Sequence, residues 1–401
     1  MQTGSTPSTS TYLDGLIRRF CASRDLLTYD LYDIWKTRYG FRVKNFYNCH
    51  RSVGLVPAGV FALFDLLNNR RRLFYAPSEF AIVRSHAVLC LLKLYEQTLD
   101  SSLIDIARQH LKWLLAHSCT GYSGPCWGLG FPHAVARGLI YDSNTPLSVM
   151  TPYALEAFVG FSRVSGDDRF IPAVRGICRF FEHDIQVMEE DADVLATSYG
   201  PFKDRIVTNA VSYSMYARAL SLPYLGPLQR TQTEQAIRKM YAYIHRQQQQ
   251  DGAWWYSPQA GSFIDCFHSC IVMKNVLKTS QLLALENSDG LVAKGYWYLT
   301  RAFLDEEQFL FRRFSVANKP GLVRFDLYDS AEVLNLAVLM GDHSLARKLL
   351  ASVIAHFCEG TNVYSQIDIF GKRRSKNTLR WAVMPFLYGA SQLATAAALL
   401  Q

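Results

Sequence analysis

A coarse internal repeat constrains this chain more than any single motif. Short segments rich in aromatic residues, glycine and charge recur about 55–70 residues apart, and each is followed by an apolar stretch with helical spacing. The segments are residues 126–133, 197–205, 251–256, 309–314 and 364–374. Each interval is long enough for two helices and their turns. Self-similarity at this period is typical of repeat architectures, so the sequence predicts a series of helical hairpins.

About six such hairpins can close into a ring whose loops converge, at one end, on a single cavity. We therefore expect an all-α, (α/α)6-type toroid with minor β-hairpins in its loops, one of them around Gly371. Helices are expected over well more than half of the residues, and the two chain ends are expected to pack together. The 401 residues are 49% hydrophobic and contain no linker-like segment. We expect one domain over residues 13–401, preceded by a disordered tail, residues 1–12.

The charge balance argues against a nucleic-acid partner. The net charge is +8, and the basic residues occur in short runs at 70–72, 312–313 and 372–374. Neither a recognition helix, zinc-finger spacing nor an aromatic ribonucleoprotein motif is visible. The runs fit either a solvated face or an anionic partner, such as an acidic polysaccharide or a lipid-linked glycan.

Cysteine usage and the chain start predict the compartment. The nine cysteines have no CxxC spacing, and most stand among apolar residues, which is typical of unpaired buried thiols in a reducing compartment. The Ser/Thr-rich start lacks the basic and apolar regions of a signal peptide. The longest apolar runs are interrupted by Arg, Asp or Glu, so no transmembrane segment is expected. The expectation is a cytoplasmic protein.

Chemistry-bearing residues are densest at 247–277. Asp265 and His268 are three residues apart at the start of a predicted helix and therefore share one face. A carboxylate beside an imidazole suits acid/base chemistry, although a helix-capping Asp with a structural His explains the same spacing. A zinc site built from Asp265, Cys266 and His268 would need ligands that point in different directions, so no metal is expected. Nucleotide-binding loops, a GxSxG elbow and HExxH are absent from the sequence, and no cofactor is expected.

The other convergent segments supply further candidates. Asp326 precedes Asp329 and Glu332, which resemble a capping box. Asn209 is either a helix cap or a catalytic amide. The candidate catalytic residues are Asp265, His268, Asp326, Tyr199 and Asn209. Sugar rings stack on aromatic faces and their hydroxyls need polar partners, so the candidate substrate-binding residues are Trp127, His133, Trp254, Trp255, Tyr256, Arg312, Arg380 and Trp381. The four tryptophans and Tyr256 form a set of five aromatic residues. At least three of the five are expected to line one cavity with Arg312 or Arg380.

The hairpin layout resembles the α/α-toroid carbohydrate-active proteins. These include six-hairpin glycosidases, N-acylglucosamine epimerases, toroid polysaccharide lyases and the C-terminal domain of heparosan glucuronyl C5-epimerases. The resemblance extends over about residues 30–401 and is carried by the segments 126–133, 144–158, 208–220, 251–256 with 264–269, and 324–334 with 379–383. The chain is also similar to toroid proteins found among bacterial cell-surface polysaccharide genes. The resemblance implies an enzyme of cell-surface polysaccharide biosynthesis or processing that acts on an oligosaccharide or polysaccharide, with an anionic or lipid-linked one favoured.

Three alternatives stay open at this point. The first is a glycan-acting enzyme whose reaction is hydrolysis, uronate epimerisation or β-elimination. Asp265 and Asp326 suit hydrolysis, whereas Tyr199, His268, Asn209 and Arg380 suit the other two reactions. The segment 247–256 is also similar to the Gln/Trp repeat of terpene cyclases, and 264–270 to the Asp-x-x-His helix of protein prenyltransferases, which implies an isoprenoid substrate. A glycan-binding protein without catalytic activity is the third alternative.

Overall fold

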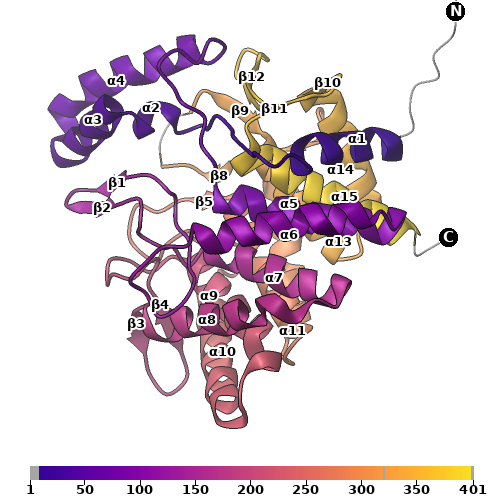
Figure 1. Cartoon of the computed structure of the whole chain (residues 1–401). Coiled ribbons are helices and arrows are strands. Elements are labelled where there is room, and N and C mark those ends of the chain that lie inside the picture. Colours follow the sequence, from indigo (N-terminus) through magenta and orange to yellow (C-terminus); the bar gives the residue numbers. More distant parts are fainter. Residues whose placement is uncertain (1–8, 319–320, 399–401) are drawn as a thin grey trace, which may run out of the picture.

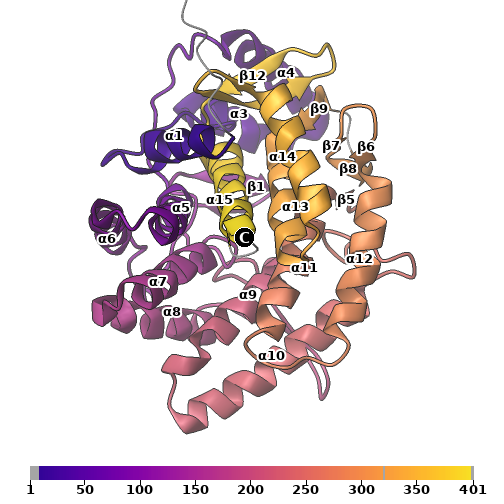
Figure 2. The same ribbon diagram turned by 90° about the vertical axis from the view of Figure 1, so that its right-hand side faces the viewer.

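Six helices form a closed inner ring in the computed structural model, which describes residues 9–318 and 321–398. They are α5 (Ala81–Thr98), α7 (Thr151–Ser165), α9 (Thr208–Ser221), α11 (Cys266–Ser280), α13 (Leu327–Leu339) and α15 (Met384–Ala398). Each contacts the next around the ring, and α15 closes it against α5 (Figure 2). Helices make up 59% of the described residues, which confirms the predicted all-α toroid.

A second set of helices pairs with the inner ring from outside. These are α6 (Ser101–Ala116), α8 (Ile171–His183), α10 (Pro227–Gln247), α12 (Ser288–Ala302) and α14 (His343–Phe357). The sixth outer position is taken by the N-terminal helix α1 (Thr9–Cys21), which packs against both α5 and α15 (Figures 1 and 2). The two ends of the described chain therefore meet, as expected. The helix α1 begins inside the stretch predicted as a tail, and residues 1–8 lie outside the described residues.

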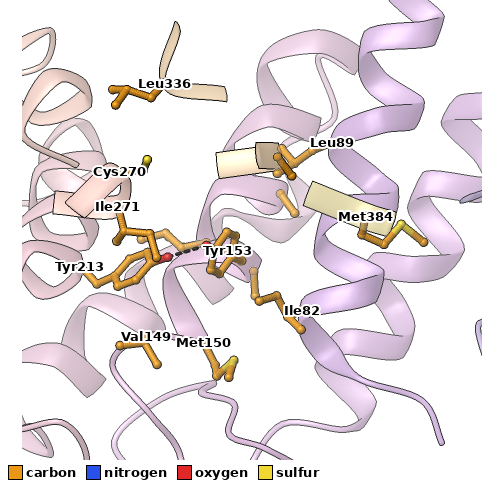
Figure 3. Close-up of a cluster of buried hydrophobic side chains, with 14 of the residues drawn as sticks. Ile82, Leu89, Val149, Met150, Tyr153, Tyr213, Cys270, Ile271, Leu336 and Met384 are labelled. Atoms are coloured by element: carbon orange, nitrogen blue, oxygen red, sulfur yellow. Dashed lines mark hydrogen bonds between the residues drawn. The ribbon is translucent and has the colours of Figure 1, made fainter. Parts of the chain in front are cut away.

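Burial explains which helices are inside. The inner helix α5 is buried on every side, from Ile82 to Leu92 without a break, whereas the outer helix α6 buries one stripe that includes Leu103, Ala107 and Leu111. A helix that is apolar all round lies within a core, and an amphipathic one covers it. Figure 3 shows a cluster of buried side chains that come from all six inner helices and from the residues directly before α7. Within this cluster the hydroxyls of Tyr153 and Tyr213 are hydrogen-bonded to each other.

Short strands lie in the connections. The pairs are β1 (His133–Ala136) with β2 (Leu139–Tyr141), β3 (Val187–Glu190) with β4 (Leu195–Thr197), β5 (Ile264–Asp265) with β8 (Phe314–Val316), and β6 (Leu304–Asp305) with β7 (Leu310–Phe311). A four-stranded sheet contains β9 (Val323–Asp326), β10 (Cys358–Glu359), β11 (Asn362–Asp368) and β12 (Arg373–Lys376). The turn from β11 to β12 contains Gly371 at a φ of 75°, which confirms the predicted hairpin there.

The segment before the ring was not predicted. It holds α2 (Asp33–Lys36), α3 (Arg38–Cys49) and α4 (Arg51–Asn68), which lie to one side of the ring, next to β1 (Figure 1). Within the described residues, α4 alone is long and apolar enough to cross a membrane, at a mean hydropathy of 1.2 with 11% of it buried. The apolar run of α4 was not predicted as a membrane-length segment because Asp65 interrupts it near its end.

Candidate active site

A cavity of about 730 Å³ opens where the inner helices begin. Its wall includes Met150 and Asp265, which precede α7 and α11, and Asp326, which precedes α13. The polar and aromatic groups that line it include Tyr32, His133, Tyr141, Tyr199, Arg205, Tyr256, Asp265, His268, Arg313, Asp326, Tyr328, Gln366, Arg380 and Trp381. The segments that recur along the sequence therefore do converge on one cavity at the loop end of the toroid.

Asp265 and His268 form a dyad in this wall. The Nδ1 atom of His268 is 2.9 Å from Oδ1 and 2.7 Å from Oδ2 of Asp265, whose side chain is buried. Asp265 stands at the N-cap of α11, but its side chain makes no capping hydrogen bond. The carboxylate thus holds the ring, with Nδ1–H as donor, and leaves Nε2 as the nitrogen that can accept a proton. The rings of Tyr256 and Phe267 pack around the imidazole, with centroids 4.6 and 3.9 Å from its own.

Arg313 connects two carboxylates beside the dyad. Its guanidinium lies 3.1 Å from Oδ2 of Asp326 and 2.7 Å from Oδ2 of Asp329, and it stacks over Phe267 at 4.9 Å. Asp326 is the N-cap of α13: it accepts from the backbone N–H of Tyr328 at 3.0 Å and from the Gln366 side chain at 3.0 Å. The cap is therefore Asp326 and not Asp329, because only Asp326 precedes the first helical residue.

Asp329 lies behind this wall and is fully buried. Burial raises its pKa from 3.8 to about 7, and the negative charge of Asp326 adds to the rise although Arg313 opposes it. One of its oxygens, Oδ1, has no hydrogen-bond partner among the described residues. Desolvation of this second oxygen outweighs the ion pair at the first, which accounts for the direction of the shift.

A second cation, from the segment before α9, also lines the cavity. The guanidinium of Arg205 stacks over Tyr199 at 4.5 Å, and Tyr199 in turn lies parallel to Tyr141 with ring centroids 6.4 Å apart. Within the described residues Arg205 forms no ion pair, so its charge is not neutralised by a carboxylate within 4.0 Å. Burial raises the pKa values of Tyr199 and Tyr256, so both hydroxyls stay protonated at neutral pH.

His133 lies on β1 at the mouth of the cavity. Its Nε2 is 3.1 Å from Nζ of Lys44, and Tyr32 meets the imidazole edge-on at 5.6 Å. Burial, with the positive charges of Lys44, Arg380 and Arg205, lowers the pKa of His133 to about 3. The ring is consequently neutral at physiological pH and serves as a hydrogen-bonding group.

Arg380 and Trp381 enter the wall from a π-helical turn, residues Leu379–Val383, that precedes α15. The Arg380 side chain is 2% exposed and makes two 2.7 Å contacts with the carboxylate of Asp30. Its charge is thereby neutralised, although the rings of Phe80 and Phe131 also surround it. The structure thus gives Arg380 a structural partner that the sequence did not reveal.

Eight of the thirteen sequence-predicted site residues line the cavity. They are Tyr199, Asp265, His268, Asp326, His133, Tyr256, Arg380 and Trp381. Five do not: Asn209, Trp127, Trp254, Trp255 and Arg312. Only Tyr256 and Trp381 of the expected aromatic set face the cavity with Arg380, so the prediction that at least three would do so is wrong.

The misplaced tryptophans belong to the core. Trp127 is 2% exposed and donates to the Leu114 carbonyl at 3.0 Å, and Trp254 is 3% exposed and donates to the Ile244 carbonyl at 3.1 Å. Each indole thus satisfies its N–H on the end of an outer helix. Trp255 is half-buried against the core, outside the cavity lining. In each of these segments, other residues line the cavity, namely His133 and Tyr256, while the tryptophans face the core.

Arg312 and Asn209 are displaced for different reasons. The side chain of Arg312 is 59% exposed and pairs with Asp305 at 2.6 Å, because consecutive residues of an extended chain point to opposite sides and Arg313 takes the inward one. Asn209 is not a cap: the N-cap of α9 is Val207, and the Asn209 side chain is buried with its Oδ1 unpartnered among the described residues.

Sequence reasoning missed Arg313, Arg205, Tyr328 and Gln366. Because side chains alternate along an extended segment, residues 312–314 could have indicated that the two arginines point to opposite sides. Arg205 lies in the recurring segment 197–205 but was not among the candidate site residues. Gln366 is placed by pairing between β11 and β9, which no local pattern reveals. Among the described residues, no group of three or more His, Cys, Asp and Glu side chains has a metal-binding arrangement.

Comparison with known proteins identifies the fold. No protein-family model and no curated protein matches the sequence. Among solved structures, cellobiose 2-epimerase from Bacillus thermoamylovorans B4167 superposes with a TM-score of 0.60 at 9% identity, over 80% of this chain and 88% of that one. A GH76 α-mannanase from Bacteroides thetaiotaomicron gives 0.57 at 9%, over 80% and 88%. An unsaturated glucuronyl hydrolase from Streptococcus agalactiae gives 0.53 at 11%, over 80% and 82%. The chain therefore has the α/α-toroid fold that these carbohydrate-active proteins share.

Proposed function

We propose that this protein is an enzyme that moves a proton at a carbon atom of a saccharide, as an epimerase, isomerase or lyase does. The observation that carries the proposal is the Asp265–His268 dyad in the cavity wall, with both carboxylate oxygens within 2.9 Å of Nδ1. An imidazole held in this way presents Nε2 as a general base, and the carboxylate stabilises the imidazolium that forms.

The lining of the cavity supports a saccharide substrate. Aromatic rings of Tyr199, Tyr256, Phe267 and Trp381 offer faces for stacking, and polar groups such as Gln366 stand between them. A concave site with this mixture is typical of small-molecule binding. Proteins of the same fold include one named a cellobiose 2-epimerase, one named a D-mannose isomerase and one named a polysaccharide lyase.

The carboxylates favour proton transfer at carbon over hydrolysis. Hydrolysis of a glycosidic bond needs two carboxyl groups free to act on it, one of them protonated. Here Asp265 is engaged with His268, and Asp326 accepts from Tyr328 and Gln366 while it pairs with Arg313. The carboxyl with the raised pKa, Asp329, is fully buried and does not line the cavity.

One cation in the wall supports an anionic substrate, such as a uronate. Arg205 forms no ion pair among the described residues, whereas Arg313 is already paired with Asp326 and Asp329. The N-terminal ends of α7, α11 and α13 also face the cavity, and their backbone dipoles favour negative charge there. Arg205 could neutralise a sugar carboxylate and so stabilise the carbanion left by proton removal. A lipid-linked or polymeric saccharide of the cell surface, handled in the cytoplasm, fits this assignment.

Solvent exchange distinguishes the reaction classes. The protein is incubated in deuterium oxide with a panel of neutral and uronate-containing oligosaccharides, and the products are followed by NMR. Deuterium bound to a sugar carbon, or a new unsaturated uronate, supports proton transfer at carbon. New reducing ends with neither carbon-bound deuterium nor an unsaturated uronate indicate a hydrolase instead. Binding without any product indicates a glycan-binding protein, and either of these results contradicts the proposal.

A further inference from the structure

The helices α3 and α4 form a hairpin that stands beside the ring (Figure 1). They pack closely where Gly54 of α4 meets Tyr47 of α3: a methyl group at Gly54 would lie 2.5 Å from the Tyr47 Cα. One side of α4 is therefore covered by α3. Apart from Gly54 and Asn68, no residue of α4 is fully buried.

The uncovered side of α4 is apolar. We call the residues Val53, Val56, Val60, Leu63 and Leu67 the α4 stripe, because their spacing of three and four places them along one helix face. Their exposed fractions run from 56% for Leu63 to 74% for Leu67. A helix on the surface of a globular protein normally turns such a face inward. A contiguous exposed apolar face of this kind marks a contact surface.

Exposed positive charge lies on the hairpin and directly after it. Five arginines between residues 38 and 71 are exposed, and none of them forms an ion pair among the described residues: Arg38, Arg42, Arg51, Arg70 and Arg71. The one acidic residue between 38 and 72 is Asp65, which accepts a hydrogen bond from the Tyr75 hydroxyl at 2.7 Å. The exposed surface of the hairpin therefore combines apolar side chains with charge of a single sign.

We propose that this hairpin docks on an anionic lipid membrane, with the α4 stripe among the acyl chains and the arginines at the headgroups. An apolar face flanked by arginine is the pattern of helices that lie in the membrane interface. The hairpin lies on the bilayer and does not cross it, because α3 carries Arg42 and Lys44 within its length and charged side chains at the bilayer centre are costly. A second copy of the chain is a poorer occupant, because a symmetric contact would bring the two arginine sets together.

Docking would hold the cavity next to the membrane. Lys44 of α3 contacts His133 at the cavity mouth, and Tyr32 and Trp35, just before α3, are part of its wall. The other end of the hairpin is fixed to the ring, since Arg374 donates to the Leu66 carbonyl at 3.3 Å. A saccharide carried on a lipid could thus reach the site. The membrane proposal itself does not depend on which reaction the cavity performs.

Vesicle flotation with the full chain tests this proposal. We expect the protein to float with vesicles of phosphatidylcholine and phosphatidylglycerol, and not with phosphatidylcholine alone. Leu67→Glu should abolish flotation, whereas the matched control Leu228→Glu should not: the two leucines are 74% and 75% exposed, and Leu228 lies on α10. Arg70→Gln and Arg71→Gln should each weaken partitioning about fivefold.

Three results would overturn the proposal. One is absence of wild-type flotation with anionic vesicles, and another is equal flotation with both kinds of vesicle. The third is a dimer in sedimentation velocity that Leu67→Glu converts to a monomer, without any vesicle binding, which would make the α4 stripe an interface between copies. Circular dichroism of each variant verifies that the ring is folded. Absence of wild-type flotation together with deuterium exchange by the wild-type protein would refute docking and leave the proposed reaction intact.

Discussion

At the scale of single residues, the proposed proton transfer depends on the contact that the carboxylate of Asp265 makes. A buried carboxylate at the start of a helix usually caps it, but this one accepts from an imidazole and makes no capping bond. The spacing of Asp265 and His268 predicted a shared face, and the structure places the two in contact. The assignment of a catalytic role to them remains a prediction.

Asp265→Asn should lower turnover about 10²–10⁴-fold, the range typical of acid/base groups. The asparagine amide would donate to Nδ1 and force the ring proton onto Nε2, which removes the base. The melting temperature should change little, because no capping bond is lost. Turnover and melting temperature are measured on the same preparation. Unchanged turnover with a lowered melting temperature would show that the pair is structural.

Asp329 predicts a pH dependence of stability. Its pKa is raised by burial from 3.8 in the unfolded chain to about 7 in the folded one, so the folded state binds the extra proton between these values. This contribution to stability is fully present below the unfolded pKa and is lost as pH rises through about 7. Asp329→Asn should therefore gain stability relative to wild type between about pH 5 and about pH 8. Urea denaturation of both proteins measures the difference; a difference that is constant with pH would contradict the raised pKa.

At the scale of elements, the repeat predicted the helices well and the loops less well. Apolar periodicity identifies a helix whatever lies around it, so segments such as α5 and α14 could be predicted from the sequence. Whether an aromatic residue in a turn faces the core or the cavity depends on partners from other hairpins. Trp254 illustrates this: its indole packs where Gly295 of α12 leaves room, a contact that no local pattern contains. The hairpin of α3 and α4 lies outside the repeat and was missed for that reason.

The alternation at Arg312 and Arg313 gives a matched pair of variants. Arg313→Gln leaves the buried carboxylates of Asp326 and Asp329 without a cation, so we expect a loss of about 3–5 kcal/mol in the free energy of unfolding and a fall in turnover. Arg312→Gln removes an exposed pair with Asp305 and should cost about 0–1 kcal/mol. Urea denaturation and turnover are compared between the two. Equal effects would mean that the two arginines do not diverge as the structure has them.

At the scale of the whole molecule, the ring is closed by the chain ends. The sequence predicted this closure from the repeat alone, and α1 does pack between α15 and α5. The ion pair between Arg380 and Asp30 joins the turn before α15 to the N-terminal segment. This pair could not be predicted. Its partners are 350 residues apart in the sequence, and each has several other residues of opposite charge available.

Breaking this bond should weaken the whole fold. Asp30→Asn leaves the buried Arg380 guanidinium without its counter-ion, and we expect a loss of about 3–5 kcal/mol in the free energy of unfolding. The control is Asp100→Asn, which removes an exposed ion pair with Arg18 and should change stability little, because asparagine can also cap α6, where Asp100 accepts from the backbone N–H of Ser102. Both are measured by urea denaturation. If Asp30→Asn were no more destabilising than the control, the buried pair would not be what secures the ring.

The central claim is that His268 takes a proton from a carbon atom of a saccharide in the cavity. The most direct measurement is the rate at which deuterium from solvent enters a sugar carbon, for wild type, His268→Gln and the control Arg312→Gln, whose side chain lies outside the cavity. We predict that wild type and control form carbon-deuterated sugar, or an unsaturated uronate where the reaction is an elimination, at similar rates, and that His268→Gln does so about 10²–10⁴-fold more slowly. A rate that is unaffected by His268→Gln, or turnover that yields neither carbon-bound deuterium nor an unsaturated uronate, would contradict this role of His268.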